Sequence, residues 1–490
     1  MAISFIVYDL IFLVAFTLFV IVFLYTHRKN LEKEGLLYLY RTKLGLKIID
    51  RIGRKYRRTL KVLSFVSITM GYTLMAMIVY MMIKVVYFYY AFPSIVRAIK
   101  VPPLITLVPY LPAIFKIDFL PPFYFTYWIL IIAIIAITHE MAHGIYARYF
   151  NIKVKSTGFG FLGPFLAAFV EPDEKDMAKK GIFPQLVILS AGTFANILTA
   201  MFFFVILVLY FSAAFTPAGL IFNTYSYAQI PISEINNYEM LNGTFVSFNS
   251  NKSGLLQNAE ARSLIAANLQ QGLTEIKIKN NKSYFIDINL VEINRQSENE
   301  SVILAYYDSP AVREQLQGAI ISINEVPILS REDLQRELEK YIPGQRVMIT
   351  TQIDEGNQQN YSIVLGKHPL NENVSFLGVG FVSQEQRGVF GKVSKMFTAF
   401  KSSSTYYRPA FDGVSIFVYN LLWWIILISI SVALVNMLPL GLFDGGRFFY
   451  LTVLAITRSE SFAKKSFTFM TYFFLFLLAL LMVFWALAFL

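Results

Sequence analysis

The most constraining feature of this sequence is an apolar stretch, residues 131–144, that carries three ionisable side chains. They are His139, Glu140 and His143, in the pattern His-Glu-x-x-His. On a helix, residues i and i+4 lie on one face about one turn apart, so both imidazoles can bind one metal ion beside Glu140. Ionisable groups in lipid are costly and usually functional. A polar pair in a helical core, or a chance match, is the weaker alternative because the chain has only four histidines.

Composition places the chain among membrane proteins. It has 490 residues, of which 56% are hydrophobic, and this indicates a polytopic membrane protein with a soluble part. The net charge is +11, and twelve Lys and Arg residues lie within residues 27–61. The positive-inside rule explains a charge confined to one segment better than a nucleic-acid partner does. The same segment could also bind lipid head groups, and the two interpretations are compatible. The chain has no cysteine, which excludes disulfides, thiol nucleophiles and Cys-ligated zinc.

The hydropathy pattern predicts the fold class: a polytopic α-helical membrane protein with about six transmembrane helices and an inserted α+β soluble region. The predicted spans are residues 5–25, 62–90, 123–150, 183–211, 414–438 and 467–490. We interpret the first as a retained anchor. The basic loop at 27–61 is expected in the cytoplasm, which puts both termini and the insertion outside. A second basic inner loop is expected after the fifth span, with Arg447, Arg458, Lys464 and Lys465. His139 and His143 fall in the cytoplasmic half of the third span.

Two segments beside this span carry further signals. Residues 154–170 are apolar but broken by glycine and proline, which favours a re-entrant hairpin over an ordinary cytoplasmic loop. The fourth span contains Gly192, whose size permits close helix contact, and Asn196, a polar group that needs a partner in lipid. For Asn196, a helix–helix contact and a contact with substrate or active site are equally open.

The insertion shows an internal repeat. Residues 241–249 match 316–324, and each match is followed by a helical pattern (260–270 and 331–340) and a strand pair (275–290 and 346–365). The second copy resembles a circularly permuted PDZ domain in Asp308-Ser-Pro-Ala311, the strand and turn at 318–324, Pro327 and Tyr341-Ile-Pro-Gly344, and residues 376–380 would supply another strand. The first copy is divergent. The predicted divisions are 1–92 (two N-terminal helices with a basic loop), 93–213 (first half of the membrane core), 214–300 (divergent PDZ-like domain), 301–390 (PDZ domain) and 413–490 (second half of the core).

A catalytic zinc site usually has three protein ligands and one open position. His139 and His143 supply two, so the third must lie at the same membrane depth. Asp412 lies at the outer end of the fifth span, whereas Asp444 lies at the inner end, level with His143. Depth alone therefore favours Asp444.

These motifs together resemble those of the site-2 protease family of intramembrane zinc metalloproteases. The sequence has His139-Glu140-x-x-His143, Asn436-x-x-Pro439 followed by Asp444-Gly445, and a helix with Gly192 and Asn196 in which Thr193 stands where proline is usual. The likeness covers residues 122–213 and 413–490, and a PDZ insertion between these halves is a family arrangement. It implies that Zn²⁺ is bound by His139, His143 and Asp444, that Glu140 is the catalytic base and acid, and that Asn196 and Asn436 hold the substrate backbone.

The resemblance implies cleavage of transmembrane segments of membrane-tethered proteins, as in regulated intramembrane proteolysis. The expected partners are a membrane-spanning protein substrate, the lipid bilayer and a peptide or protein ligand of the PDZ-like region. The expected location is the cell membrane, with the PDZ-like region extracytoplasmic and the active site towards the cytoplasm. A zinc transporter is disfavoured because the spans carry few charges outside the motifs, and an inactive scaffold is disfavoured by the intact Glu140.

Overall fold

The structure is a computed structural model. It describes residues 5–34, 37–92, 96, 108–115, 117, 120–162, 165–231, 237–239, 245–247, 273–277, 282–287, 290, 293–294, 302–354, 357–382 and 398–487. The chain divides into two compact units. One contains Met1–Phe211 and Gly413–Leu490, and the other contains Ser212–Asp412.

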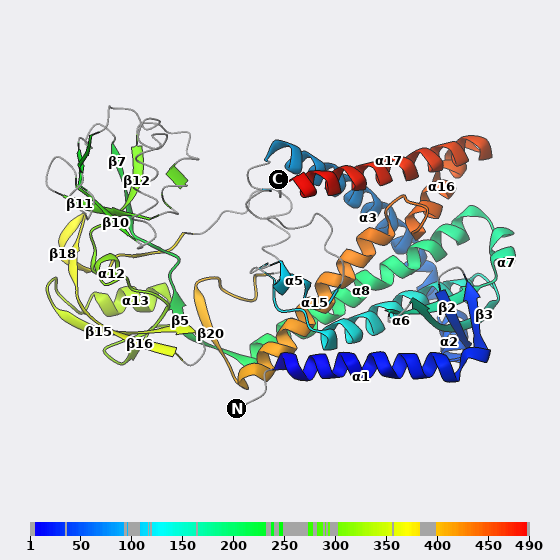
Figure 1. Cartoon of the computed structure of the whole chain (residues 1–490), viewed down its shortest axis with the longest axis horizontal. Coiled ribbons are helices and arrows are strands. Elements are labelled where there is room, and N and C mark those ends of the chain that lie inside the picture. The colour runs from blue at the N-terminus through cyan, green and yellow to red at the C-terminus, as the bar shows by residue number, and fades with distance from the viewer. Residues whose placement is uncertain are drawn as a thin grey trace. The chain divides into compact units, whose positions relative to one another are not determined.

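Six helices of the first unit are long and apolar enough to cross a membrane (Figure 1). They are α1 (Phe5–Thr26), α3 (Arg57–Ala91), α6 (Phe125–Tyr149), α8 (Ile182–Ala214), α15 (Asp412–Asn436) and α17 (Glu460–Leu487). Their outward faces carry large apolar side chains such as Phe19, Met201, Leu209 and Phe476, each more than 60% exposed, as expected of surfaces that face lipid. The six predicted spans are confirmed as helices, although α17 begins at Glu460 rather than at residue 467.

A four-stranded antiparallel sheet lies in the same unit, in the order β1-β2-β3-β4. Its strands are β1 (Leu31–Glu34), β2 (Leu37–Thr42), β3 (Val154–Leu162) and β4 (Phe165–Pro172). Strands β3 and β4 form a hairpin where one was predicted at 154–170, and its entry into the membrane stays a prediction. The basic segment at 27–61, predicted as a cytoplasmic loop between two spans, contains β1, β2, the short helix η1 (Arg28–Asn30) and helix α2 (Leu46–Lys55).

Glycine permits the two hairpins to pair. Gly158 of β3 lies opposite Arg41 of β2, and a Cβ on Gly158 would lie only 2.3 Å from the carbonyl oxygen of Tyr40. Such a separation is far below a van der Waals contact, so a larger residue would push β2 away from β3.

Helix α2 supports the end of α6. Gly53 packs so closely that a Cβ there would lie 2.8 Å from Cβ of Arg148, and Nε of Arg148 lies 2.5 Å from Oδ1 of Asp50. Ile49, fully buried, meets Gly144, the residue after His143. The segment that carries many of the basic residues therefore holds the second half of α6 in place.

Helix α1 caps the other end of α6. Asp9, which is 1% exposed, accepts hydrogen bonds from the backbone N–H groups of Phe125 (2.7 Å) and Thr126 (2.9 Å), and from the hydroxyls of Thr126 and Tyr110 (both 2.5 Å). The first N–H groups of a helix have no partner within it, so a buried carboxylate from α1 supplies one.

The connection between the last two spans, predicted as a basic inner loop, contains helix α16 (Asp444–Thr457), which was not predicted. Its first turn contains Gly445 and Gly446, which resemble helix breakers in the sequence. In the structure they allow close packing, since a Cβ on Gly445 would lie 2.3 Å from the carbonyl carbon of Met437 and one on Gly446 would lie 2.4 Å from the carbonyl oxygen of Leu440. The remaining short helices of this unit are α5 (Leu111–Ile114) and α7 (Glu174–Ala178).

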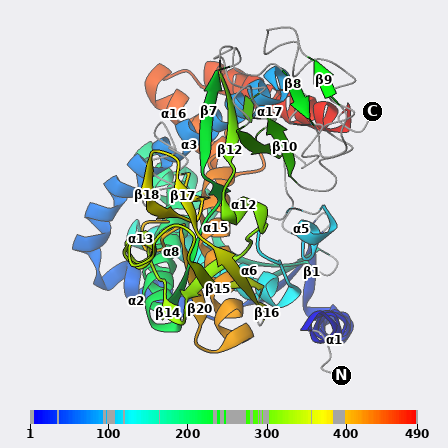
Figure 2. The ribbon, with the colours of Figure 1, turned by 90° about the vertical axis from the view of Figure 1, so that its left-hand side faces the viewer.

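The second unit is rich in strands (Figure 2). One sheet has the order β16-β15-β13-β5-β20, with β14 paired to β13, and another has the order β10-β11-β12-β7. Three two-stranded pairs are β17-β18, β19-β6 and β8-β9. The bounds are β5 (Phe215–Ile221), β6 (Thr224–Tyr225), β7 (Tyr227–Pro231), β8 (Asn237–Glu239), β9 (Phe245–Ser247), β10 (Thr274–Lys277), β11 (Ser283–Ile286), β12 (Val302–Tyr307), β13 (Ala319–Ile323), β14 (Val326–Pro327), β15 (Arg346–Asp354), β16 (Asn357–Val364), β17 (Gly366–His368), β18 (Asn371–Phe376), β19 (Val379–Gly380), β20 (Thr405–Pro409), and the helices are α12 (Pro310–Arg313) and α13 (Arg331–Leu338).

Strand pairing crosses the predicted division between residues 300 and 301. β12 follows that division but pairs with β7 and β11, whereas β5 precedes it and pairs with β13. The helical pattern predicted at 331–340 is confirmed by α13, and the pattern at 260–270 lies outside the described residues. Two separate apolar cores, one around Ile303 and one around Ile320, are consistent with two modules that exchange strands.

Candidate metal and active site

Helix α6 places the two histidines of the motif on one buried face. His139 and His143 are 8% and 9% exposed, and their Nε2 atoms lie 3.0 Å apart. The Nδ1 atom of His143 lies 2.7 Å from the carbonyl oxygen of Ile188 on α8. When Nδ1–H donates to this carbonyl, Nε2 keeps its lone pair for a metal.

Asp444 meets both imidazoles. Its Oδ2 atom lies 3.5 Å from Nε2 of His139 and 3.4 Å from Nε2 of His143. Tetrahedral zinc with bonds of about 2.0–2.1 Å holds its ligand atoms about 3.3 Å apart. The three atoms are therefore spaced as a tetrahedral ion requires, and two nitrogens with one carboxylate oxygen form a donor set that zinc accepts.

Gly192 of α8 leaves space beside these atoms. A Cβ on Gly192 would lie 2.4 Å from Nε2 of His143 and 2.5 Å from Nε2 of His139. A side chain at residue 192 would therefore press on both Nε2 atoms, and glycine leaves the space beside them open. The glycine thus fits a metal site as well as close helix packing.

Glu140 also lies in this cluster, because its carboxylate and the two imidazoles have ligand atoms within 4.8 Å of one another. Its Oε2 atom accepts a hydrogen bond from the backbone N–H of Val170 on β4, at 2.9 Å. The carboxylate is therefore held by the sheet, whereas that of Asp444 touches both imidazoles. Away from these four residues, the described part of the chain shows no other group of three or more potential ligands so close together.

The two asparagines differ in their surroundings. Asn196 is fully buried, with its Nδ2 atom 3.1 Å from Nδ1 of His139 and its Oδ1 atom without a partner in the described structure. If the side-chain amide of Asn196 is turned by 180°, its Oδ1 and Nδ2 atoms change places with nearly the same shape. Oδ1 would then accept the Nδ1–H of His139 when that imidazole binds a metal through Nε2. Asn436, in contrast, lines a cavity beside the cluster.

Two cavities meet at the cluster, and both are lined by His139, Glu140 and Asp444. The first has a volume of about 390 Å³ and is mainly apolar. It is lined further by Ile132, Ile135, Ala136, Ala167, Ala168, Ile428, Val432, Asn436, Leu442 and Phe443. The second, of about 570 Å³, has a charged wall that includes Arg41, Lys155, Glu171, Glu174, Lys175 and Arg447. Arg447 was not predicted as a site residue. Its position three residues after Asp444 could have indicated it, because residues three apart on a helix are neighbours.

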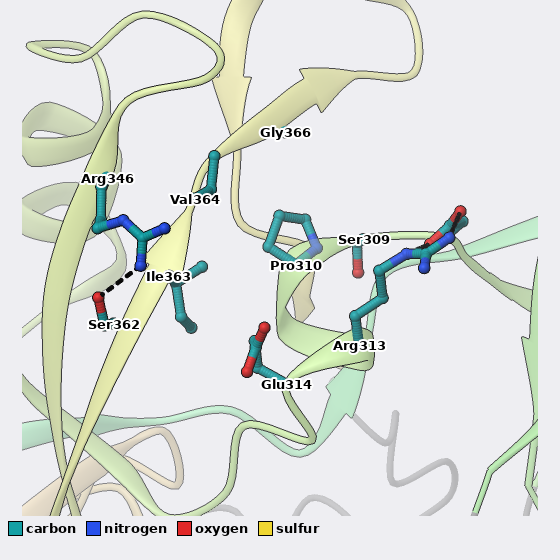
Figure 3. A pocket seen from close by; sticks show the side chains of 10 residues that line it. Ser309, Pro310, Arg313, Glu314, Arg346, Ser362, Ile363, Val364 and Gly366 are labelled. Carbon is teal, nitrogen blue, oxygen red and sulfur yellow. Dashed lines mark hydrogen bonds and ion pairs between the residues drawn. The ribbon is translucent and has the colours of Figure 1, made fainter.

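The second unit has a pocket of its own, of about 360 Å³, between α12 and the end of β16 (Figure 3). Arg313 binds both carboxylate oxygens of Asp308 at 2.5 and 2.6 Å, and Arg346 donates to the hydroxyl of Ser362 at 3.1 Å. Its lining residues contain no histidine, so it does not resemble the cluster on α6.

Comparison with known sequences agrees with this geometry. Residues 127–480 match the sequence model of Peptidase family M50, and the match contains the histidine motif and Asp444. Uncharacterized protein MJ0971 of Methanocaldococcus jannaschii is 32% identical over 197 residues, which covers 38% of this chain and 48% of that protein. The chain thus spans about half the length of this curated relative. Because the family match covers most of the chain, this protein belongs to peptidase family M50, the site-2 protease family of membrane metallopeptidases.

Proposed function

We propose that this protein is an intramembrane zinc metalloprotease that cleaves transmembrane segments of membrane-tethered proteins. One observation carries the proposal: the Asp444 carboxylate meets the imidazoles of His139 and His143, while the Glu140 carboxylate lies beside them. The first three residues would hold Zn²⁺. Bound zinc supplies a polarised scissile carbonyl and a water that loses its proton near neutral pH.

Glu140 would serve as general base and then as general acid. It would take the proton of the attacking water and deliver it to the leaving amide nitrogen. The N–H of Val170 holds one of its carboxylate oxygens, which fixes the side chain while the other oxygen is left for proton transfer. Asn196 would act through His139 rather than on substrate, whereas Asn436 is placed in the apolar cavity, where a substrate backbone would lie.

Strand β4 offers a docking edge for an unwound substrate. It is the last strand of its sheet, and the N–H of Val170 points away from β3 towards Glu140. Backbone groups alternate along a strand, so Ala168 presents its N–H and C=O to the same side, where it lines the apolar cavity. An extended peptide could therefore add to this edge with its scissile bond near Glu140.

The depth of the site predicts where the substrate is cut. His139 lies fourteen residues after Phe125, the first residue of α6, which is about 21 Å along a helix. A hydrocarbon core is about 30 Å thick, so the cut should fall in the inner half of the substrate's span. This follows the proposed topology, with the insertion and its PDZ-like modules outside the cell.

A peptide assay tests the proposed substrate class. Helix carbonyls are all bonded within the helix, so the substrate must unwind before it can be cut. We expect Gly or Pro near the cut to speed cleavage of a single-span peptide, because Gly weakens a helix by about 1 kcal/mol and Pro by about 3 kcal/mol. Leu at the same positions should slow cleavage. Mass spectrometry locates the cut. Cuts in the outer half, or rates indifferent to these residues, would contradict the proposal.

A further inference from the structure

We propose that Arg447 forms a carboxylate-binding subsite in the charged cavity, where it binds a carboxylate group of the chain being cut. This inference rests on the proposed function and deepens it, because it names a chemical preference of the substrate. Arg447 lies on α16 three residues after Asp444, and both line the charged cavity together with His139 and Glu140.

The packing of α16 fixes the direction of Arg447. Gly445, Gly446 and Phe448 are buried, and the two glycines lie against the backbone of residues 437–441 so closely that no side chain would fit. Residues three apart on a helix share a face, so Arg447 lies on the face of Asp444 and away from the glycines. The contact that places Asp444 at the metal cluster therefore also places Arg447 in the cavity.

Two other cations that line this cavity already have carboxylate partners. Arg41 pairs with Glu171 at 3.1 Å and with Glu32, and Lys155 pairs with Asp173 at 3.4 Å. The N–H groups of Asp176 and Lys175, with Lys155, hold the pKa of Asp173 below its usual range.

Arg447 is half-buried and forms no ion pair or hydrogen bond within the described part of the chain. Lys175, an exposed residue that also lines this cavity, likewise has no ion-pair partner among the described residues. An unpaired guanidinium beside a catalytic cluster is therefore the feature of the cavity that calls for an anionic ligand.

The ligand chemistry follows from the guanidinium and from the two cavities. A guanidinium is planar, always charged and suited to bind a carboxylate through two parallel hydrogen bonds. The apolar cavity suits the membrane-spanning part of a substrate, so the charged cavity receives the residues beyond it. A carboxylate there has two sources. One is an acidic side chain just past the span, and the other is the new terminal carboxylate of a cleavage product.

Binding measurements separate the two sources. In the Glu140→Gln background, affinity is measured for a single-span peptide with Glu or Gln just past the span, and for a product peptide ending in a free carboxylate or an amide. We expect the acidic member of at least one pair to bind about tenfold more tightly, as a hydrogen bond to a charged group would give. Adding Arg447→Gln should abolish that preference, Arg447→Lys should retain part of it, and the exposed Lys465→Gln should leave it intact.

A preference confined to the first pair assigns the subsite to a substrate side chain, and one confined to the second assigns it to the product. If Arg447→Gln binds each pair with the same ratio as its parent, the subsite does not exist. Zinc content and thermal unfolding of each variant show that the fold is kept. Cleavage by the protein that retains Glu140 tests proteolysis separately. If peptides are cut but the acidic and neutral peptides bind equally, only the proposed subsite is rejected. If the acidic peptide binds more tightly but no peptide is cut, only the proposed proteolysis is rejected.

Discussion

Gly192 of α8 lies directly against His143 of α6, so that a Cβ on residue 192 would lie 2.4 Å from Nε2 of that histidine. We predict that Gly192→Ala abolishes metal binding, because its methyl group would displace the Nε2 atoms of His139 and His143 that would hold the ion. Metal analysis of the purified protein checks this. The control is Gly181→Ala, where the new Cβ would lie 3.9 Å from its nearest neighbour. Stoichiometric zinc in Gly192→Ala would show that the ion lies elsewhere.

Asn196 should orient His139. Replacement by Leu removes the hydrogen-bond partner of Nδ1, and loss of such a partner typically weakens metal binding by about 10–100-fold. Titration against a competing chelator measures the zinc affinity. Thr199→Val, one turn along the same buried face, is the matched control, since Thr199 bonds to Ala195 and Thr138 and not to a histidine. Unchanged zinc affinity with lost cleavage would instead favour the contact with substrate that the family resemblance implies.

Asp9 should stabilise the catalytic helix from α1. Asp9→Ala leaves the N–H groups of Phe125 and Thr126 without their acceptor, and we expect a loss of about 3 kcal/mol in the free energy of unfolding. Thermal unfolding and hydrogen exchange at residues 125–128 measure it. Thr17→Val, also on α1, removes only a hydroxyl bonded to Leu13 within that helix and should have little effect. Equal stability of Asp9→Ala and the unmodified protein would refute the capping role.

The two glycines of β3 should differ in their tolerance of alanine. At Gly158 a Cβ would lie 2.3 Å from the carbonyl oxygen of Tyr40, whereas at Gly160 its nearest neighbour would be a side-chain carbon of Leu39 at 3.4 Å. Gly158→Ala should therefore expose the N–H groups of residues 37–42 to hydrogen exchange and reduce cleavage. Gly160→Ala should do neither. Similar exchange in both variants would mean that β2 does not depend on this close approach.

The membrane helices were predictable because an apolar run of about 20 residues is a local signal that needs no partner. The histidine motif was predictable for the same reason, since its two imidazoles are brought together by one helix. Asp444 could be chosen over Asp412 only because the predicted topology put Asp444, and not Asp412, at the membrane depth of His143. The structure brings Asp444 to both histidines and leaves Asp412 at the start of α15.

The missed features depend on contacts between distant segments. Strands β1 and β2 lie in a basic segment with little periodicity. β2 gains its place by pairing with β3, which is far away in sequence, and β1 pairs with β2. Helix α16 was missed because Gly445 and Gly446 have low helix propensity, and only the facing backbone of residues 437–441 shows that their size is needed. The contact of Asn196 with His139 was open for the same reason, because sequence alone does not show which helix faces it.

The central claim is tested most directly by metal content and peptide cleavage in three proteins: unmodified, Glu140→Gln and Asp444→Ala. The account predicts that the unmodified protein contains zinc, cuts single-span peptides, stops when a chelator removes the ion and resumes when zinc is restored. Glu140→Gln should keep its zinc and lose cleavage, whereas Asp444→Ala should lose both. Cleavage that survives the chelator or persists in Glu140→Gln, or full zinc occupancy in Asp444→Ala, would contradict it.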